Sequence, residues 1–301
     1  MTSTTKSSHR SLFLSVAAAL MFTAACDDPD QTADAVLLAD LDPAAVEVLE
    51  LAAVADDETP AMDSPALDEL AQATPTTEAK ALCRILPLGD SITYGWNGNW
   101  AQQSDPSGNY LGGYRSHLVY GMAVSPSPTV GTFVMAGVRQ DNSPPWLVSW
   151  GQSWHAGAPG FTNLQLAAAV DQGASNVNPD IILLHAGTND ILSGPAPKAA
   201  NAVGTLYKLL ERLRVKNPAA TVLLAKIIPL AGPLNTEVIA YNANLDTVAA
   251  NLRGIGQKVW TVDLNTNFPV WTLEDGIHPN WAGYQNMAAR WRYALDVVGC
   301  W

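Results

Sequence analysis

Short apolar runs and longer amphipathic stretches alternate along the chain from about residue 84 onward. Apolar runs typical of buried strands occur at 84–88, 132–136, 180–185, 221–228 and 257–262. Stretches with the helical repeat of apolar positions lie at 114–122, 163–172, 198–215, 235–253 and 281–298. Strands that alternate with helices favour βαβ units, in which helices cover both faces of a parallel sheet. We therefore expect an α/β domain, a flavodoxin-like three-layer α/β/α sandwich with a five-stranded parallel sheet.

Residues 27–80 do not follow this pattern. They are rich in Ala, Asp, Glu, Pro and Thr, contain no aromatic residue, and hold fifteen of the 28 acidic residues of the chain against a single Lys80. The net charge of -12 therefore belongs to this segment, and residues 81–301 are close to neutral. We expect 27–80 to be a disordered acidic linker and 81–301 to be the domain. Because no basic patch is present, nucleic acid is not an expected partner.

The N-terminus has the features of an export signal. Lys6 and Arg10 precede an apolar stretch at 12–22 that is short for a membrane span, and small residues then lead to Cys26. We expect residues 1–26 to be a signal peptide with a lipobox-like end, and Cys26 to be lipidated. Thr23 stands where a lipobox usually has Leu, so plain secretion is the alternative. Either way the protein is exported, with membrane contact only through this lipid anchor.

Cys83 and Cys300 are candidates for a disulfide bond, because export leads to an oxidising compartment. Cys83 precedes the first predicted strand and therefore lies at the amino edge of the sheet. The last predicted helix runs back across the sheet and carries Cys300 to the same edge. The alternative is two unpaired buried thiols.

Three polar motifs stand at the ends of predicted strands or just before a helix. Gly89-Asp90-Ser91 follows the first apolar run, 185–190 follows the third, and 275–280 precedes the last helix. Because the carboxyl ends of parallel strands meet at one edge of a sheet, we expect the motifs to lie together. Ser91 can then act as a nucleophile, with His278 as its base and Asp275 orienting the imidazole.

The amide of Asn189 can donate a hydrogen bond to an oxyanion that forms beside Ser91. A helix N-cap by Asn189 or Asp190 is the alternative. The Asp275–His278 loop on its own also fits an ordinary turn or a pair of metal ligands. No second cluster of His or Cys accompanies it, which disfavours a metal site.

Together the three motifs resemble blocks one, three and five of the SGNH (GDSL-like) hydrolase superfamily, over essentially all of residues 84–298. The resemblance implies the SGNH fold, a triad of Ser91, His278 and Asp275, Asn189 as an oxyanion donor alongside the Ser91 N–H, and no cofactor. Residues 155–162 (HAGAPGFT) are similar to the H-x-G-x-x-G-[WF] segment of bacterial acetylxylan esterases of carbohydrate esterase family three. That register makes the N–H of Gly160 a further oxyanion donor, with Gly157 as the fallback; a turn glycine with positive φ is the alternative for Gly160.

Tryptophans gather in the stretch between residues 93 and 114, which is longer than in that esterase group, and again before residue 155. Trp96 and Trp100 stand among Asn, Gly and Gln, and Trp154 precedes the His155 segment together with Trp146 and Trp150. Aromatic faces beside amides suit sugar rings, so Trp96, Trp100 and Trp154 are candidate substrate contacts. The alternative is that these side chains cover the sheet edge.

These features together indicate a monomeric serine esterase that removes short acyl groups, acetyl above all, from a small-molecule or polysaccharide ester of a carbohydrate. A lysophospholipase or thioesterase for longer acyl chains is the alternative enzyme. A surface-binding lipoprotein without turnover is the alternative from another class.

Overall fold

The computed structural model describes residues 65–73, 82–105, 107–124 and 132–299. The predicted signal peptide, Cys26, most of the acidic linker and Cys300 lie outside these residues. No helix in the described ranges is both long and apolar enough to span a bilayer.

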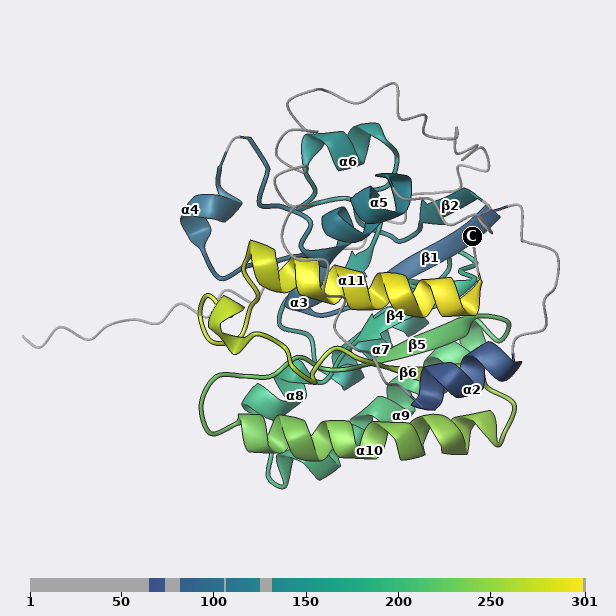
Figure 1. Cartoon of the computed structure of the whole chain (residues 1–301). Coiled ribbons are helices and arrows are strands. Elements are labelled where there is room, and N and C mark those ends of the chain that lie inside the picture. Colours follow the sequence, from purple (N-terminus) through teal and green to yellow (C-terminus); the bar gives the residue numbers. More distant parts are fainter. Residues whose placement is uncertain (1–64, 74–81, 106, 125–131, 300–301) are drawn as a thin grey trace, which may run out of the picture. The chain divides into compact units, whose positions relative to one another are not determined.

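A parallel sheet forms the centre of the domain (Figure 1). Its order is β2-β1-β4-β5-β6 and every pairing is parallel. The strands are β1 (Leu82–Gly89), β2 (Thr132–Met135), β4 (Ile181–His185), β5 (Thr221–Lys226) and β6 (Val259–Asp263). The two-residue strand β3 (Ala156–Gly157) adds to the carboxyl end of β1, where Leu88 pairs with Ala156 and Gly89 with Gly157. The predicted five-stranded flavodoxin-like sheet is confirmed, with β3 as an addition.

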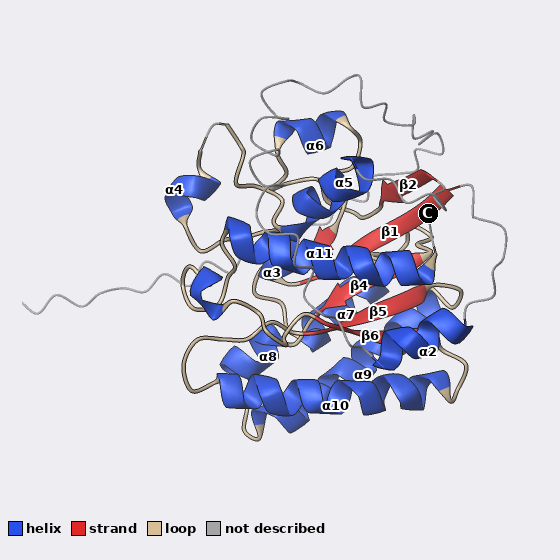
Figure 2. Ribbon diagram, viewed as in Figure 1, coloured by secondary structure: helices blue, strands red, loops and turns tan. Residues whose placement is uncertain are grey.

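Helices cover the two faces of the sheet (Figure 2). One face carries α7 (Asn163–Asp171), α9 (Lys198–Lys216) and α10 (Asn235–Arg253), and the other carries α2 (Pro65–Ala73), α5 (Tyr114–Val124) and α11 (Trp281–Val298). Shorter helices lie in the loops: α3 (Ser91–Tyr94), α4 (Trp100–Gln103), α6 (Pro145–Ser149), α8 (Thr188–Ser193) and the 3-10 turn η2 (Val270–Thr272). The result is the predicted three-layer α/β/α arrangement.

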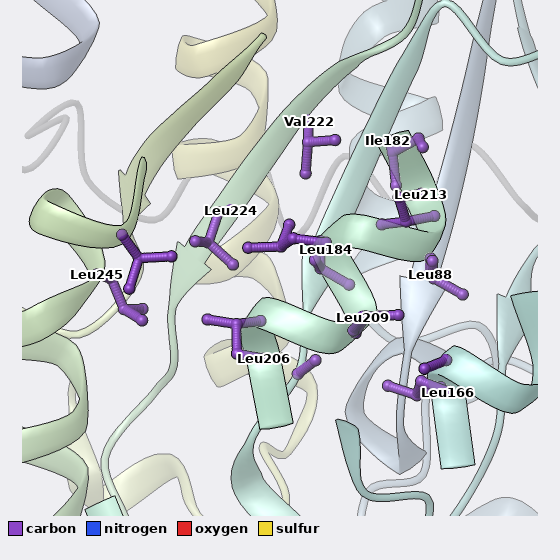
Figure 3. Close-up of a cluster of buried hydrophobic side chains, with 14 of the residues drawn as sticks. Leu88, Leu166, Ile182, Leu184, Leu206, Leu209, Leu213, Val222, Leu224 and Leu245 are labelled. Atoms are coloured by element: carbon purple, nitrogen blue, oxygen red, sulfur yellow. The ribbon is translucent and has the colours of Figure 1, made fainter. Parts of the chain in front are cut away.

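Strand β4 shows why the sequence signal for this fold is clear. All of its residues are buried, because the strand has a helix layer on each face. Ile182 and Leu184 point into the core beneath α7 and α9 (Figure 3), whereas Ile181 and Leu183 belong to the core on the other face. A strand buried on both faces requires a continuous apolar run, and that is the pattern in the sequence.

Helix α2 lies within the segment expected to be disordered. It packs against β6 and α11, and its Leu70 is buried in the core on that face. Glu69 forms an ion pair with Arg253 at 3.0 Å. The expectation of disorder does not hold for these nine residues. The helix packs one leucine against the apolar core of the domain, and the composition of the segment alone does not reveal that contact.

Cys83 occupies the amino end of β1, where it is fully buried and disulfide-bonded. This excludes the alternative of a free thiol for Cys83. Its partner lies outside the described residues, so the pairing with Cys300 stays a prediction.

Candidate active site

Ser91, His278 and Asp275 form a continuous chain of hydrogen bonds at the carboxyl edge of the sheet. Ser91 Oγ lies 2.8 Å from His278 Nε2, and His278 Nδ1 lies 2.8 Å from Asp275 Oδ2. Asp275 Oδ1 accepts two backbone N–H groups, from Ile277 at 3.0 Å and from His278 at 2.8 Å. Because Asp275 holds both the ring and the backbone of the histidine, the imidazole has one fixed orientation toward Ser91.

The carboxylate of Asp275 is held in its charged form. Burial alone would raise its pKa, but the hydrogen bonds from the His278 ring and from two backbone N–H groups outweigh that effect and place the pKa below its ordinary value. An ionised partner favours the tautomer of His278 with the proton on Nδ1. That tautomer leaves Nε2 as an acceptor for the proton of Ser91.

Ser91 is the first residue of the short helix α3, which begins just after β1. Asp90 caps this helix by accepting the N–H of Ile92 at 2.9 Å, and its carboxyl group is completely buried. Burial raises the pKa of Asp90 to about 7, although the hydrogen bonds that the carboxylate accepts, above all from the Ile92 N–H, act in the opposite direction. The cap fixes the turn that presents Ser91 to the cavity.

Arg115 of α5 holds the far end of α3 in place. Its buried guanidinium donates to the carbonyl oxygens of Thr93 at 3.0 Å and Tyr94 at 2.9 Å. It also donates to Asn142 O at 2.9 Å, and to Ser143 Oγ and Ser153 O. Burial lowers the pKa of Arg115 to about 10, so it stays protonated near neutral pH. One buried cation thereby joins the Ser91 turn to the 142–153 loop.

The second motif follows β4 and supplies Asn189 at the second position of α8. Its Nδ2 donates to Phe161 O at 3.0 Å, which ties it to the loop that contains Gly160. Gly187 is the N-cap of α8, and Asp190 instead accepts hydrogen bonds from Asn163 N and Thr205 Oγ1. The N-cap interpretation of Asn189 and Asp190 is therefore wrong.

Backbone hydrogen bonds distinguish the two candidate oxyanion donors, Gly157 and Gly160. The N–H of Gly157 donates to His155 Nδ1 at 3.0 Å and is therefore already engaged. Among the described residues, no hydrogen bond uses the N–H of Gly160, which lies on the cavity wall. Gly160 also has a φ of 80°, as the turn interpretation expects. The turn interpretation of Gly160 is therefore confirmed, and its role as an oxyanion donor stays a prediction, whereas the Gly157 N–H is already used by His155.

His155, beside β3, and His185, at the end of β4, are buried histidines with roles outside the triad. His155 is buried, and its Nε2 donates to Asp141 O at 2.9 Å while Nδ1 accepts the Gly157 N–H. His185, at the end of β4, is also completely buried, and burial lowers its pKa to about 3. Burial also lowers the pKa of His155, so both rings are neutral near pH 7, and neither lines the cavity above Ser91.

A cavity of about 660 Å³ opens above Ser91. Its wall combines the reactive residues, aromatic side chains, polar groups and a few apolar ones: Ser91, Tyr94, Trp96, Trp100, Gln103, Arg139, Asn142, Pro159, Gly160, Thr188, Asn189, Leu192, Ile277 and His278. Of the three tryptophans expected at the site, Trp96 and Trp100 line it. Trp154 is half-buried and is not part of the wall.

Trp146 and Trp150 have the alternative role expected for these tryptophans, that of covering the core. Their rings meet edge to face with centroids 4.8 Å apart, and both pack against the apolar core. Trp146 lies on α6 and Trp150 is its C-cap, and neither lines the cavity above Ser91. The covering interpretation therefore applies to this pair, whereas substrate contact by Trp96 and Trp100, which line the cavity, stays a prediction.

Several cavity residues were not found from the sequence. Tyr94, Arg139 and Asn142 line the wall, and Arg139 binds Asp141 while its guanidinium lies 5.5 Å from the Tyr94 ring. The sequence does contain a signal for Arg139 and Asn142: the polar stretch at 139–143 follows β2 at the same carboxyl edge as the other motifs. In the part of the chain that the structure describes, no group of three or more His, Cys, Asp or Glu could hold a metal ion.

Known proteins resemble this chain in sequence and in fold. Residues 88–285 match the model of the GDSL-like Lipase/Acylhydrolase family. A multidomain esterase of Ruminococcus flavefaciens is 30% identical over 255 residues, which are 76% of this chain and 30% of that protein. The chain thus spans about a third of the length of that relative.

Two solved structures share the fold. A family 3 carbohydrate esterase of Clostridium thermocellum superposes with a TM-score of 0.56 at 24% identity, over 72% of this chain and 97% of that one. A carbohydrate esterase family 3 protein of Talaromyces cellulolyticus gives 0.57 at 23%, over 71% and 96%. The family model spans all three polar motifs and most of the sheet. The chain therefore belongs to the GDSL-like lipase/acylhydrolase family, a family of carboxylic ester hydrolases.

Proposed function

We propose that this protein hydrolyses short-chain acyl esters, acetyl esters above all, on carbohydrates, with Ser91 as nucleophile and His278 as general base. The observation that carries the proposal is the hydrogen-bonded chain from Ser91 through His278 to Asp275, with Ser91 and His278 in the wall of a large cavity. No step requires a cofactor, because the hydroxyl supplies the nucleophile, the imidazole transfers the protons and the carboxylate orients the imidazole.

In the acylation step, Ser91 Oγ attacks the ester carbonyl carbon as its proton moves to His278 Nε2. The charge that develops on the carbonyl oxygen is stabilised by the N–H groups of Ser91 and Gly160 and by the Asn189 amide. The bond to the leaving alkoxy oxygen then breaks, and His278 returns the proton to that oxygen. A free sugar hydroxyl leaves, and the acyl group stays on Ser91.

Deacylation repeats these steps with water. His278 Nε2 takes a proton from the water as its oxygen attacks the acyl carbon, and the same N–H groups hold the second oxyanion. The bond to Ser91 Oγ breaks, and His278 gives the proton back to the serine. The ionised Asp275 stabilises the imidazolium that forms in each half-reaction.

The cavity wall supports a carbohydrate as the alcohol part of the ester. Trp96 and Trp100 offer ring faces on which the C–H face of a sugar can stack, and Gln103 and Asn142 offer amides for its hydroxyl groups. The similar proteins, a multidomain esterase and family 3 carbohydrate esterases, agree with this substrate class. A long acyl chain would instead need a continuous apolar channel.

The test compares acyl length with alcohol type. Hydrolysis of p-nitrophenyl acetate is expected, with kcat/KM falling from acetate to butyrate to octanoate, together with release of acetate from acetylated xylan. A rise in kcat/KM toward octanoate would favour a lysophospholipase or thioesterase. Absence of turnover on every ester would favour a binding lipoprotein without catalysis.

We also propose that the protein is exported and anchored through lipidated Cys26, which lies outside the described residues. The support is the sequence of residues 1–26 alone. Metabolic labelling with palmitate in a bacterial host should mark the wild type and not Cys26→Ser. Secretion of an unlabelled wild-type protein would contradict the anchor and leave plain secretion.

A further inference from the structure

Two tryptophans stand out for their exposure. Trp100 is 73% exposed and Trp271 is 77% exposed, whereas the next aromatic side chains in the described ranges are Tyr293 at 41% and Tyr110 at 37%. A tryptophan can bury 150–250 Å² of largely apolar surface, so leaving two of them in water is costly. A single exposed apolar side chain needs no explanation, but two on adjoining segments do.

A hydrogen bond joins the two segments that carry these tryptophans. Asn99 directly precedes Trp100 and caps α4, and its Nδ2 donates to Glu274 Oε1 at 3.0 Å. Glu274 comes three residues after Trp271 in the chain. Three residues span at most about 10 Å of backbone. The segments that carry the two exposed aromatic side chains are therefore neighbours beside the Asp275–His278 loop.

The backbone beneath Trp271 is fixed. Thr272 is completely buried, and its carbonyl oxygen accepts the N–H of Asn280 at 2.7 Å. Leu273 pairs with Pro279 in an isolated bridge, and the N–H of Glu274 donates to His278 O at 2.9 Å. The chain around Trp271 is thus held to the loop that contains the proposed base. Its exposed ring is presented by an ordered segment.

The segment beneath Trp100 is also fixed. Gly98 has a φ of 78°, and a Cβ on it would lie 2.8 Å from the Asp275 carboxyl carbon, so this backbone rests directly on Asp275. The ring of Trp96 meets that of Trp100 edge to face at 4.5 Å between centroids. Trp100 lines the cavity while most of its surface faces solvent, so the aromatic surface is continuous with the site.

We propose that Trp271, together with Trp100, binds a neutral glycan chain outside the ester-binding cavity. A polysaccharide that presents one acyl group to Ser91 then continues over Trp100 toward Trp271, and its sugar rings stack on the two indoles. The Asn99 amide and the Glu274 carboxylate, which bond to each other where the two segments meet, still have a second N–H and a second carboxylate oxygen for sugar hydroxyls. The carboxylates of Glu274 and Asp275 disfavour an anionic chain or an anionic membrane at this place.

This inference rests on the proposed function for the identity of the substrate, but its test separates the two. The inactive Ser91→Ala protein is applied to insoluble xylan, glucomannan and cellulose, alone and combined with Trp271→Ala. Binding to at least one polymer is expected, and Trp271→Ala should weaken it about 5–10-fold, while Trp271→Phe keeps most of it. Tyr293→Ala, which removes another exposed aromatic side chain on α11, is the matched control and should bind like the parent.

Kinetics supply the second readout in the active protein. Trp271→Ala should raise KM for an acetylated polymer by the same factor, with kcat and all constants for p-nitrophenyl acetate unchanged. Equal losses on polymer and small ester would overturn the inference, because Trp271 would then be structural. Failure to bind any of the polymers would also overturn it, even with full p-nitrophenyl acetate turnover.

Two further outcomes distinguish a failure of the glycan-binding inference from a failure of the proposed esterase function. Polymer binding that depends on Trp271 in a protein without p-nitrophenyl acetate hydrolysis would sustain the inference and reject the proposed function. Binding to vesicles of phosphatidylcholine and phosphatidylglycerol that depends on Trp271, without binding to polymers, would identify a membrane-facing surface and overturn the inference.

Discussion

At the scale of single residues, Asn189 links the two loops that supply the proposed oxyanion donors. One of its amide N–H groups is engaged by Phe161 O, which leaves the second for an oxyanion. A donor that acts mainly on the developing charge lowers the energy of the transition state more than that of the bound substrate. The amide should therefore affect kcat more than KM.

We predict that Asn189→Ala lowers kcat for p-nitrophenyl acetate by roughly 10²–10³-fold with little change in KM. Asn201→Ala is the control, because Asn201 also donates its amide to a carbonyl, Pro195 O at 3.0 Å, but lies on α9. That variant should retain wild-type rates. A change in KM alone for Asn189→Ala would show that the side chain binds substrate instead.

Asp90 gives a pH-dependent prediction at the same scale. Its folded-state pKa, about 7, is above the ordinary value of 3.8, because burial penalises the charged form. Between pH 4 and 7 the folded state thus binds more protons at this group than the unfolded state does, and its contribution to stability falls as pH rises. Above pH 7 the loss is complete.

Asp90→Asn keeps a side-chain oxygen for the Ile92 N–H and removes this titration. The free energy of unfolding of Asp90→Asn, relative to wild type, should therefore rise from pH 4 to 7 and level off above pH 7. Urea unfolding at several pH values measures the difference, and other carboxyl groups cancel because both proteins have them. A difference that is independent of pH would contradict the raised pKa.

At the scale of elements, the 96–104 segment and the Asp275 loop are in direct contact. We predict that Gly98→Ala lowers kcat, because the new Cβ would lie 2.8 Å from the Asp275 carboxyl carbon and displace the group that orients His278. Gly256→Ala has a similar φ of 85° with open space around it, so it carries the same backbone cost without the contact. Equal activities of the two variants would show that the contact does not matter.

The long elements of this fold could be predicted because each has a strong pattern of its own. The helix at 235–253 begins and ends where the apolar repeat does, and β4 is a fully buried apolar run. Four-residue helices such as α3 have no such pattern. Helix α3 contacts the buried guanidinium of Arg115 from a distant part of the chain, and no local signal reveals which carbonyl groups that residue will bind.

The candidate site could likewise be predicted only in part. Ser91, Asn189 and the Asp275–His278 pair were predicted together, because each motif directly follows a strand or precedes a helix at one edge of the sheet. The neighbours that shape the cavity, Arg139 and Asn142, come from an irregular loop whose path depends on Arg115 and His155. Trp154 could not be separated from Trp100 by composition, since both are tryptophans beside polar residues.

At the scale of the whole molecule, α2 connects the acidic segment to the domain. Its Leu70 is buried, and full burial of a leucine is worth about 1.5–3 kcal/mol. The exposed pair of Glu69 and Arg253 adds little. Removing residues 1–80 should therefore lower the free energy of unfolding by about 2 kcal/mol, with kcat unchanged.

The matched variant lacks residues 1–64 only and so keeps α2. It should retain the full stability, and the comparison of the two truncations by urea unfolding isolates the helix. Equal stabilities would show that α2 contributes nothing to the fold. A loss of kcat in the longer truncation would show that the helix also supports the site.

Covalent labelling of Ser91 tests the central claim most directly. An organophosphonate ester reacts with a serine that an imidazole activates, and the product mimics the tetrahedral intermediate held by the proposed oxyanion donors. Peptide mass mapping of the wild type should place a single label on Ser91 in parallel with loss of p-nitrophenyl acetate hydrolysis. The folded Ser91→Ala protein should take up no label. A label on another residue, or labelling that persists in Ser91→Ala, would contradict the account.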